Sequence, residues 1–323
     1  MRLFTAIKSP EFPLQECWSS LVIEVRPPRS FTVCCISAKS TMRVSLPSSP
    51  PITIFPMMRL SRATWSRLTP QPLPAEAAGG LETLCLDMGD QPSIAAAAAE
   101  VNSRLKGRGL DGLFNNAGIG SISPVEHTSL ATLRDIYEIN VFGQIAAIQA
   151  FLPLIRLAKG RIINAGSVGD HLTPPFAGPL ASSKAALASM SAALRLELRS
   201  QGIHVCLIEP GSINTPAVEK TLGGVGKIIS DLPPEARELY GEALRRMARS
   251  FAKSERTGSS PDAVAEVVER ALNDRKPRTR YPAGKDSTKL AILARLLPEK
   301  LLDLAVLKTF GLPTAFGKRI GRC

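Results

Sequence analysis

Two side chains near the middle of the sequence carry groups that can take part in acid–base chemistry. Ser167 carries a hydroxyl that can donate and accept hydrogen bonds, and Lys184 carries an ammonium group that lowers the pKa of a neighbouring acid. Leu180 precedes Lys184 by four residues, so the two share one face of a helix. Because leucine cannot give or take a proton, the helix offers no acid or base beside the lysine.

Small and amide-bearing residues follow two apolar runs elsewhere in the chain. The run 110–114 leads into an Asn-Asn-Ala-Gly turn at 115–118, and the run 203–208 is followed by Pro210 and Gly211. Small side chains let the backbone approach a bound ligand, and asparagine amides satisfy free backbone groups at a strand end. A single motif of this kind is weak evidence for a site, whereas several in a fixed order are specific.

The elements that would position these residues follow from an alternation of apolar runs. Short runs at 81–86, 110–114, 160–164 and 203–208 predict strands, and longer stretches at 94–105, 130–157 and 180–199 predict helices. Continuous apolar strands that alternate with helices are typical of a parallel sheet covered on both faces. The sequence therefore predicts a doubly wound α/β fold, a Rossmann-like domain over residues 79–323.

The next part of the chain predicts a lid. A charged amphipathic helix is expected at 234–253, inside a lid region 217–258. Ser260 and Pro261 have the residue types of a helix start, and we expect that helix to end near residue 272. An edge strand is expected at 280–282.

The tail 286–323 contains two short amphipathic segments within 290–307, split by Pro298, and it ends in a basic stretch. The favoured interpretation is that this tail packs against the core or a partner subunit. The alternative is a peripheral contact with a membrane surface, because an apolar face flanked by cations suits one.

Residues 1–78 differ in composition from the rest. They hold 11 prolines and no glycine, and 26–75 has seven basic residues and no acidic one. Such a composition resembles an organellar transit peptide, although three glutamates before residue 26 are unusual for one. The alternative is a segment from a displaced reading frame or an unusual exon. In either case we expect a poorly ordered extension before the domain.

The overall composition narrows the class of protein. The net charge is +12, but it is spread along the chain, and an aromatic content of 5% is too low for a platform that stacks nucleic-acid bases. The six cysteines show no metal-ligand spacing and suit reduced thiols in a cytoplasmic protein. No apolar run reaches the ~18–20 residues of a membrane span. We therefore expect no nucleic-acid partner, no metal and no transmembrane segment.

Residues from about 79 to 284 resemble the short-chain dehydrogenase/reductase family, most closely its steroid- and retinol-dehydrogenase-like members. The resemblance rests on the turn at 115–118, Asn140, Ser167, Lys184 and the loop 210–215, which occur in the family's order and spacing. It implies an oxidoreductase that uses NADP or NAD to interconvert an apolar alcohol and a ketone or aldehyde. It also implies that the chain can form a homodimer or homotetramer.

The resemblance implies three roles at the reacting centre. Asn140 bends its helix and holds a water of the proton relay, and Ser167 hydrogen-bonds the substrate carbonyl. Lys184 binds the nicotinamide ribose and lowers the pKa of the family's tyrosine.

It also implies where a dinucleotide would lie. The residue after the first predicted strand contacts the adenine, the 115–118 turn lines the adenosine side, and the 210–215 loop holds the nicotinamide amide. The residues so implied are Asp87, Asn115, Ala117, Gly118, Lys184, Pro210, Gly211, Ile213 and Thr215.

Two departures from the family pattern bear on activity. Leu180 stands where the family has its catalytic tyrosine, and the loss of such an acid typically lowers the rate by about 10²–10⁴. The family's glycine-rich phosphate loop cannot lie before Gly79, although 22–25 or 31–36 resembles a first strand. His171 is a minor candidate for a substitute acid.

Three interpretations stay open. The chain is an impaired oxidoreductase, a non-catalytic binding or scaffold protein, or a defective product of an aberrant 5′ end.

Overall fold

The computed structural model describes residues 84, 86–215 and 224–314, together with the backbone of three strands nearer the N-terminus. The order expected of residues 1–78 as a whole, the lid positions 216–223 and the basic end of the tail from 315 lie outside the described residues. The predicted domain boundary at residue 79 stays a prediction.

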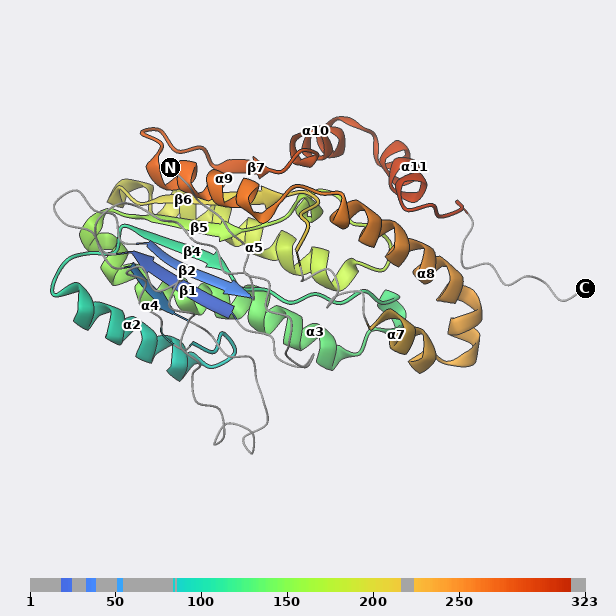
Figure 1. Ribbon diagram of the computed structural model, residues 1–323, viewed down its shortest axis with the longest axis horizontal. Helices are drawn as coiled ribbons and strands as arrows, with labels where there is room; N and C mark the ends of the chain where they lie inside the picture. Colours follow the sequence, from blue (N-terminus) through green and yellow to red (C-terminus); the bar gives the residue numbers. More distant parts are fainter. Residues whose placement is uncertain are drawn as a thin grey trace, which may run out of the picture.

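The described strands form one sheet in the order β3-β1-β2-β4-β5-β6-β7 (Figure 1). The five strands β2, β4, β5, β6 and β7 are parallel to one another. At the β2 edge, β1 pairs antiparallel with β2, and β3 pairs antiparallel with β1. The strands span Ser19–Glu24 (β1), Val33–Ala38 (β2), Pro51–Ile54 (β3), Gly112–Asn116 (β4), Arg161–Ala165 (β5), His204–Pro210 (β6) and Arg280–Ala283 (β7).

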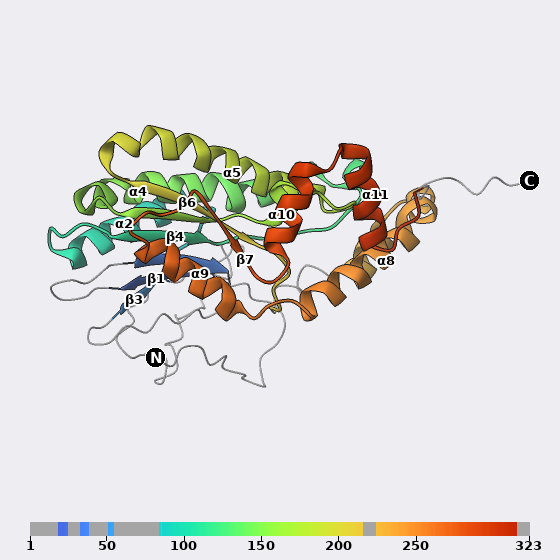
Figure 2. The same ribbon diagram turned by 90° about the horizontal axis from the view of Figure 1, so that it is seen from above.

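Helices cover both faces of this sheet. On one face, α2 (Gln91–Leu105), α4 (Gly143–Ala158) and α5 (Gly178–Glu197) pack over Leu113, Ile162 and Val205 (Figure 2). On the other face, α9 (Pro261–Asn273) packs over the residues that follow these three in the strands, Phe114, Ile163 and Cys206. Adjacent strand residues are thus buried on opposite faces, which explains the continuous apolar runs. The predicted doubly wound α/β fold is confirmed.

The N-terminal half of the sheet is built differently from a regular doubly wound fold. β2 takes the place beside β4, and the antiparallel strands β1 and β3 continue the sheet beyond it. The expectation that the N-terminal strand-loop-helix unit is absent or replaced stays a prediction, because the segments that connect these strands lie outside the described residues. The sequence predicted a strand at 81–86. This prediction was wrong at the two described positions, Leu84 and Leu86, because neither lies in a strand. β4 pairs with β5 on one side and with β2 on the other, so no further strand can pair with it.

One long helical stretch, Leu130–Ala158, contains the position of Asn140. It consists of α3 (Leu130–Tyr137), a π-helical turn η3 (Glu138–Phe142) and α4. An 18-residue window of this stretch has a mean hydropathy of 1.6, and the stretch is long enough to cross a membrane. It is, however, a core helix here, because Ala147, Ile148, Phe151 and Ile155 are buried against the sheet.

A second group of helices lies beyond the carboxyl ends of the parallel strands (Figures 1 and 2). Its members are α7 (Val225–Asp231), α8 (Pro234–Arg256), α10 (Ser287–Leu296) and α11 (Glu299–Thr309). Leu244 and Met247 of α8 pack with Val306 of α11 in a separate apolar cluster. The predicted charged helix, the two tail segments split by Pro298 and the edge strand β7 are confirmed, each with slightly different bounds.

Candidate active site

A cavity of about 340 Å³ lies where β5 and β6 end and where α5, α8, α10 and α11 meet. Five of the residues singled out from the sequence line it, namely Ser167, Leu180, Lys184, Pro210 and Gly211. Most of the remaining wall is apolar and includes Leu172, Leu290, Leu293, Val306 and Phe310. The fold therefore joins the predicted reacting groups to an apolar compartment.

Lys184 extends from α5 toward the end of β5. Its Nζ donates a hydrogen bond of 2.7 Å to the carbonyl oxygen of Ala165. A Cβ added to Gly118 would lie 3.6 Å from Nζ and 3.3 Å from Asn140 Oδ1, so this glycine keeps the space beside the lysine open. Burial lowers the pKa of Lys184 to about 8, because the protein interior solvates an ammonium group less well than water does.

Asn140 is fully buried in the π-helical turn and fixes the loop next to the lysine. Its Nδ2 donates to Ile119 O and to Ser183 Oγ, both at 2.9 Å, and its Oδ1 accepts from Ile119 N at 2.8 Å. π-helical turns are rare in proteins as a whole, but many of those that occur lie at functional sites. Here the turn directs an amide toward α5 and the 118–119 backbone, which matches the helix bend implied for this residue.

Ser167 begins the short turn η4 (Val168–Asp170) that follows β5. Its Oγ accepts a hydrogen bond of 3.0 Å from Gly169 N, which leaves the hydroxyl proton to be donated to a ligand. Leu180 lines the same cavity one turn before Lys184. An apolar side chain in the wall of the cavity therefore occupies the position at which the sequence pattern would have an acid.

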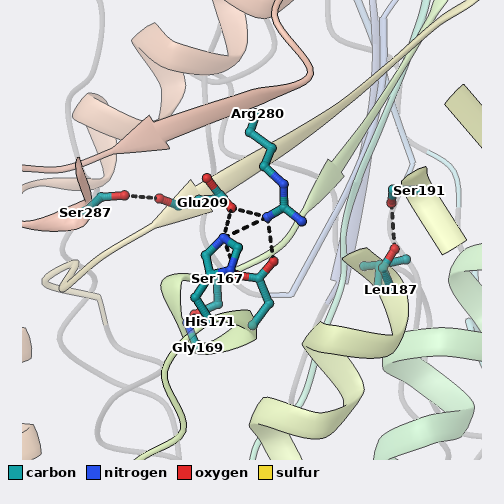
Figure 3. Close-up of polar contacts among 9 residues, drawn as sticks. Ser167, Gly169, His171, Leu187, Ser191, Glu209, Arg280 and Ser287 are labelled. Carbon is teal, nitrogen blue, oxygen red and sulfur yellow. Dashed lines mark hydrogen bonds and ion pairs between the residues drawn. The ribbon is translucent and has the colours of Figure 1, made fainter. Parts of the chain in front are cut away.

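The asparagine turn after β4 is structural as well as adjacent to the site. Asn115 Nδ2 donates to Asn164 Oδ1 at 3.0 Å, and Asn164 Nδ2 donates to Ser191 Oγ at 2.8 Å. Ser191 in turn donates to Leu187 O on the same helix (Figure 3). Gln144 donates to Ala117 O at 2.7 Å. These bonds tie β4, β5, α4 and α5 to one another.

The loop 210–215 meets two carboxylates that sequence reasoning missed. Glu255 Oε2 accepts from Ile213 N at 3.2 Å, and Asp286 Oδ1 accepts from Ser212 N at 3.1 Å. Both acids line the cavity, and burial raises the pKa of Glu255 to about 7. In the sequence Glu255 is one charge among many in a charged helix, and only the packing of α8 against this loop distinguishes it.

The remaining residues implied for a cofactor are outside the described cavity lining. Ile213 and Thr215 follow the lining part of the loop, and Asn214 N donates to Ser259 O at 2.9 Å. Asp87 is 5% exposed and accepts a hydrogen bond from Gly89 N at 2.8 Å, beside the start of α2. The adenine contact implied for Asp87 stays a prediction.

His171 belongs to a separate polar cluster (Figure 3). Its Nε2 is 2.9 Å from Glu209 Oε1 and 3.0 Å from Arg280 Nη1, and Arg280 also contacts Asp170 and Glu209. His171 is not among the described residues that line the cavity. The candidacy of His171 as a substitute acid was therefore wrong in this structure, because its ring is held on the β6–β7 side.

The same cluster has the spacing of a metal site, since ligand atoms of Asp170, His171 and Glu209 lie within 4.8 Å of one another. Arg280 Nη1 contacts all three residues, however. A guanidinium group thus supplies the positive charge that a metal ion would otherwise bring.

Comparison with known proteins agrees with this geometry. A family model described as short chain dehydrogenase matches residues 67–223. Dehydrogenase/reductase SDR family member 9 from Bos taurus is 34% identical over 241 residues, which cover 73% of this chain and 75% of that protein. Human retinol dehydrogenase 5 is 36% identical over 254 residues, 75% of this chain and 79% of that protein.

Among solved structures, a short-chain dehydrogenase/reductase from Burkholderia phymatum in complex with NAD has a TM-score of 0.56 at 21% identity, over 68% of this chain and 76% of that one. This likeness concerns the fold. The two curated relatives, together with the motifs around the cavity, assign the chain to the short-chain dehydrogenase/reductase family, as a steroid- and retinol-dehydrogenase-like member.

Proposed function

We propose that this chain interconverts an apolar alcohol and its ketone or aldehyde in the cavity between α5, α8, α10 and α11, at a rate limited by Leu180. The observation that supports this most directly is that Ser167, Leu180 and Lys184 line one cavity whose other walls are mainly apolar. Ser167 would hydrogen-bond the substrate oxygen, and the apolar walls would hold a steroid-, retinoid- or lipid-like body.

The cofactor in this proposal is NADP or NAD, which supplies or accepts the hydride when bound. The nicotinamide end fits the residues present, because Lys184 and the open space beside Gly118 lie at the ends of β4 and β5. The phosphate end fits less well, because no glycine follows β2 before Gly79. We therefore expect weak binding of the dinucleotide, since close backbone approach to a pyrophosphate needs glycine.

A second candidate function, a non-catalytic binding protein, is favoured by Leu180 itself. Without a proton donor beside Lys184, the cavity can still hold an apolar ligand. This candidate predicts ligand binding without turnover.

The proposal extends to location and partners. We propose a cytoplasmic protein with an apolar small-molecule ligand and no nucleic-acid partner. A peripheral membrane contact would run through α10 and α11, whose outer faces carry exposed leucines beside cations. Copies of the chain would associate through α5, which carries exposed Met190 and Leu196.

A thermal melt of the full chain with and without saturating NADPH or NADH tests the first step. A ligand at ~100 times its dissociation constant adds about 2.7 kcal/mol to the stability and raises the midpoint by several degrees. Product analysis after long incubation with an apolar ketone then separates the two candidates. Slow product formation that Ser167→Ala abolishes supports the oxidoreductase, whereas a stabilised protein without product supports the binding protein. No shift with either dinucleotide would overturn the proposed cofactor.

A further inference from the structure

The cavity contains an amine in an unusual setting. Lys184 is the only lysine or arginine among the described residues that line it. Leu180, one turn away, is apolar, and Ala181 and Leu172 belong to the same wall. The hydrogen bond to Ala165 O uses one N–H of the amine and fixes the position of Nζ. An amine that is held in place beside apolar walls can meet an apolar carbonyl compound directly.

The protonation state of Lys184 favours such a reaction. With a pKa of about 8, about a tenth of the amine is neutral at pH 7. An ordinary lysine, with a pKa of ~10.4, is neutral in roughly 1 of 2,500 molecules at the same pH. Only the neutral amine has a lone pair for bond formation, and desolvation in an apolar pocket is one of the ways proteins activate lysine as a nucleophile.

We propose that Lys184 captures apolar aldehydes in this cavity as an imine. The Nζ lone pair forms a bond to the carbonyl carbon, the electrons of the C=O double bond move to oxygen, and one Nζ proton is transferred to that oxygen, which gives a neutral carbinolamine. The nitrogen lone pair then forms the C=N bond as the C–O bond breaks, so the oxygen leaves as water with both protons of the neutral amine. The step needs no oxidant or reductant, and so it goes beyond the proposed oxidoreductase function and does not require a dinucleotide.

Two other groups of the cavity assist this reaction. The Ser167 hydroxyl, whose oxygen accepts from Gly169 N, can donate its proton in a hydrogen bond to the carbonyl oxygen. The carboxyl group of Glu255 lines the cavity and has a pKa raised to about 7, so a share of it holds a proton for the departing water. Leu180 adds to the apolar wall along which the aldehyde chain would lie.

The test uses the full-length chain without dinucleotide. The protein is incubated at pH 7 with decanal and sodium cyanoborohydride, which reduces an imine to a stable secondary amine, and labelled lysines are identified by peptide mass spectrometry. We expect Lys184 to be labelled at least tenfold faster than Lys227, whose side chain is 78% exposed. Urea-unfolded protein should lose this preference, because the cavity is then absent.

A matched variant identifies the reacting amine. Lys184→Arg keeps a cation and a donor for Ala165 O but has no nucleophilic amine, and we expect it to lose the fast phase of labelling. Equal labelling of Lys184 and Lys227 in the folded wild type would overturn the proposal, even if the variant fails to fold. Loss of dinucleotide binding alone would not affect this result, so the two proposals fail independently.

Discussion

At the scale of single residues, the absence of an acid at position 180 is the strongest constraint on function. Replacing Leu180 by tyrosine places a phenol one helical turn from Lys184 in the wall of the same cavity. We expect Leu180→Tyr to raise the rate of NADPH- or NADH-dependent reduction of an apolar ketone by about 10²–10⁴, the usual contribution of a positioned acid. The rate is measured by dinucleotide oxidation.

Leu180→Phe is the control for this change, because it adds the ring without the hydroxyl. Equal rates for the tyrosine and phenylalanine variants would show that Lys184 and Ser167 no longer form a working site.

The buried amine of Lys184 makes a second prediction, on stability against pH. Its pKa is about 8 in the folded chain and near its ordinary value of 10.5 in the unfolded chain. Between these two values the unfolded state binds more protons, so the free energy of unfolding rises with pH. We expect the wild type to gain about 1–3 kcal/mol relative to Lys184→Met between pH 8 and pH 10.5. Denaturant unfolding of both proteins at the two pH values measures this gain, and parallel pH profiles would contradict it.

Sequence reasoning predicted single residues well where a local motif defines them. Ser167 and Lys184 line one cavity, as their motifs imply, because each stands at a fixed offset from the end of a strand or the start of a helix. Glu255 and Asp286 could not be predicted, because their place depends on how α8 and α10 pack against the 210–215 loop. The contacts of His171 likewise depend on β7, which is more than a hundred residues away in sequence.

At the scale of elements, Arg280 links the edge strand β7 to β6 and to η4. It contacts the carboxylates of Asp170 and Glu209, whose side chains are only 2% exposed. Removing the guanidinium group would leave the two buried acids with His171 as their shared partner and without the cation that contacts both of them. We expect Arg280→Met to lower the free energy of unfolding by about 3 kcal/mol, the usual cost of breaking a buried ion pair.

Arg278→Met is the matched control for Arg280→Met, because residue 278 is on the same segment and exposed. Its effect should stay within about 0.5 kcal/mol, as for most surface substitutions. Denaturant titration measures the free energy of unfolding of both variants. Equal losses of this free energy would mean that the contacts of Arg280 with Asp170 and Glu209 add no stability.

The elements themselves were predicted where hydrophobic periodicity is strong. The helices from α2 to α11 that the sequence suggested and the strands β4 to β7 are present within a few residues of their expected bounds. The predicted strand at 81–86 was wrong at its described positions, because an apolar run of that length suits any buried extended segment. Periodicity does not say which segment pairs with β4, and β2 does so here.

At the scale of the whole molecule, two of the helices that line the cavity also carry exposed leucines and cations. Leu290, Leu293 and Val306 of α10 and α11 line the cavity, while Leu296 and Leu304 of the same helices are 76% and 50% exposed. Four cations, Lys289, Arg295, Lys300 and Lys308, are on these two helices. Anionic headgroups would attract the cations, and the leucines would enter the interface, so an apolar substrate could pass from the membrane into the cavity.

We therefore expect the protein to sediment with vesicles that contain phosphatidylserine and to be released by high salt, which screens the cations. Burial of one leucine in the interface contributes up to about 1.5–3 kcal/mol to the free energy of vesicle binding. The double variant Leu296→Ser with Leu304→Ser should therefore bind vesicles at least tenfold more weakly than the wild type. Leu157→Ser is the control, because Leu157 is 65% exposed on α4, far along the chain from the cavity-lining helices. If the double variant and the control bind vesicles as well as the wild type does, α10 and α11 are not the membrane contact. Binding by the wild type and by Leu157→Ser, but not by the double variant, would connect the apolar cavity to a membrane supply of its ligand.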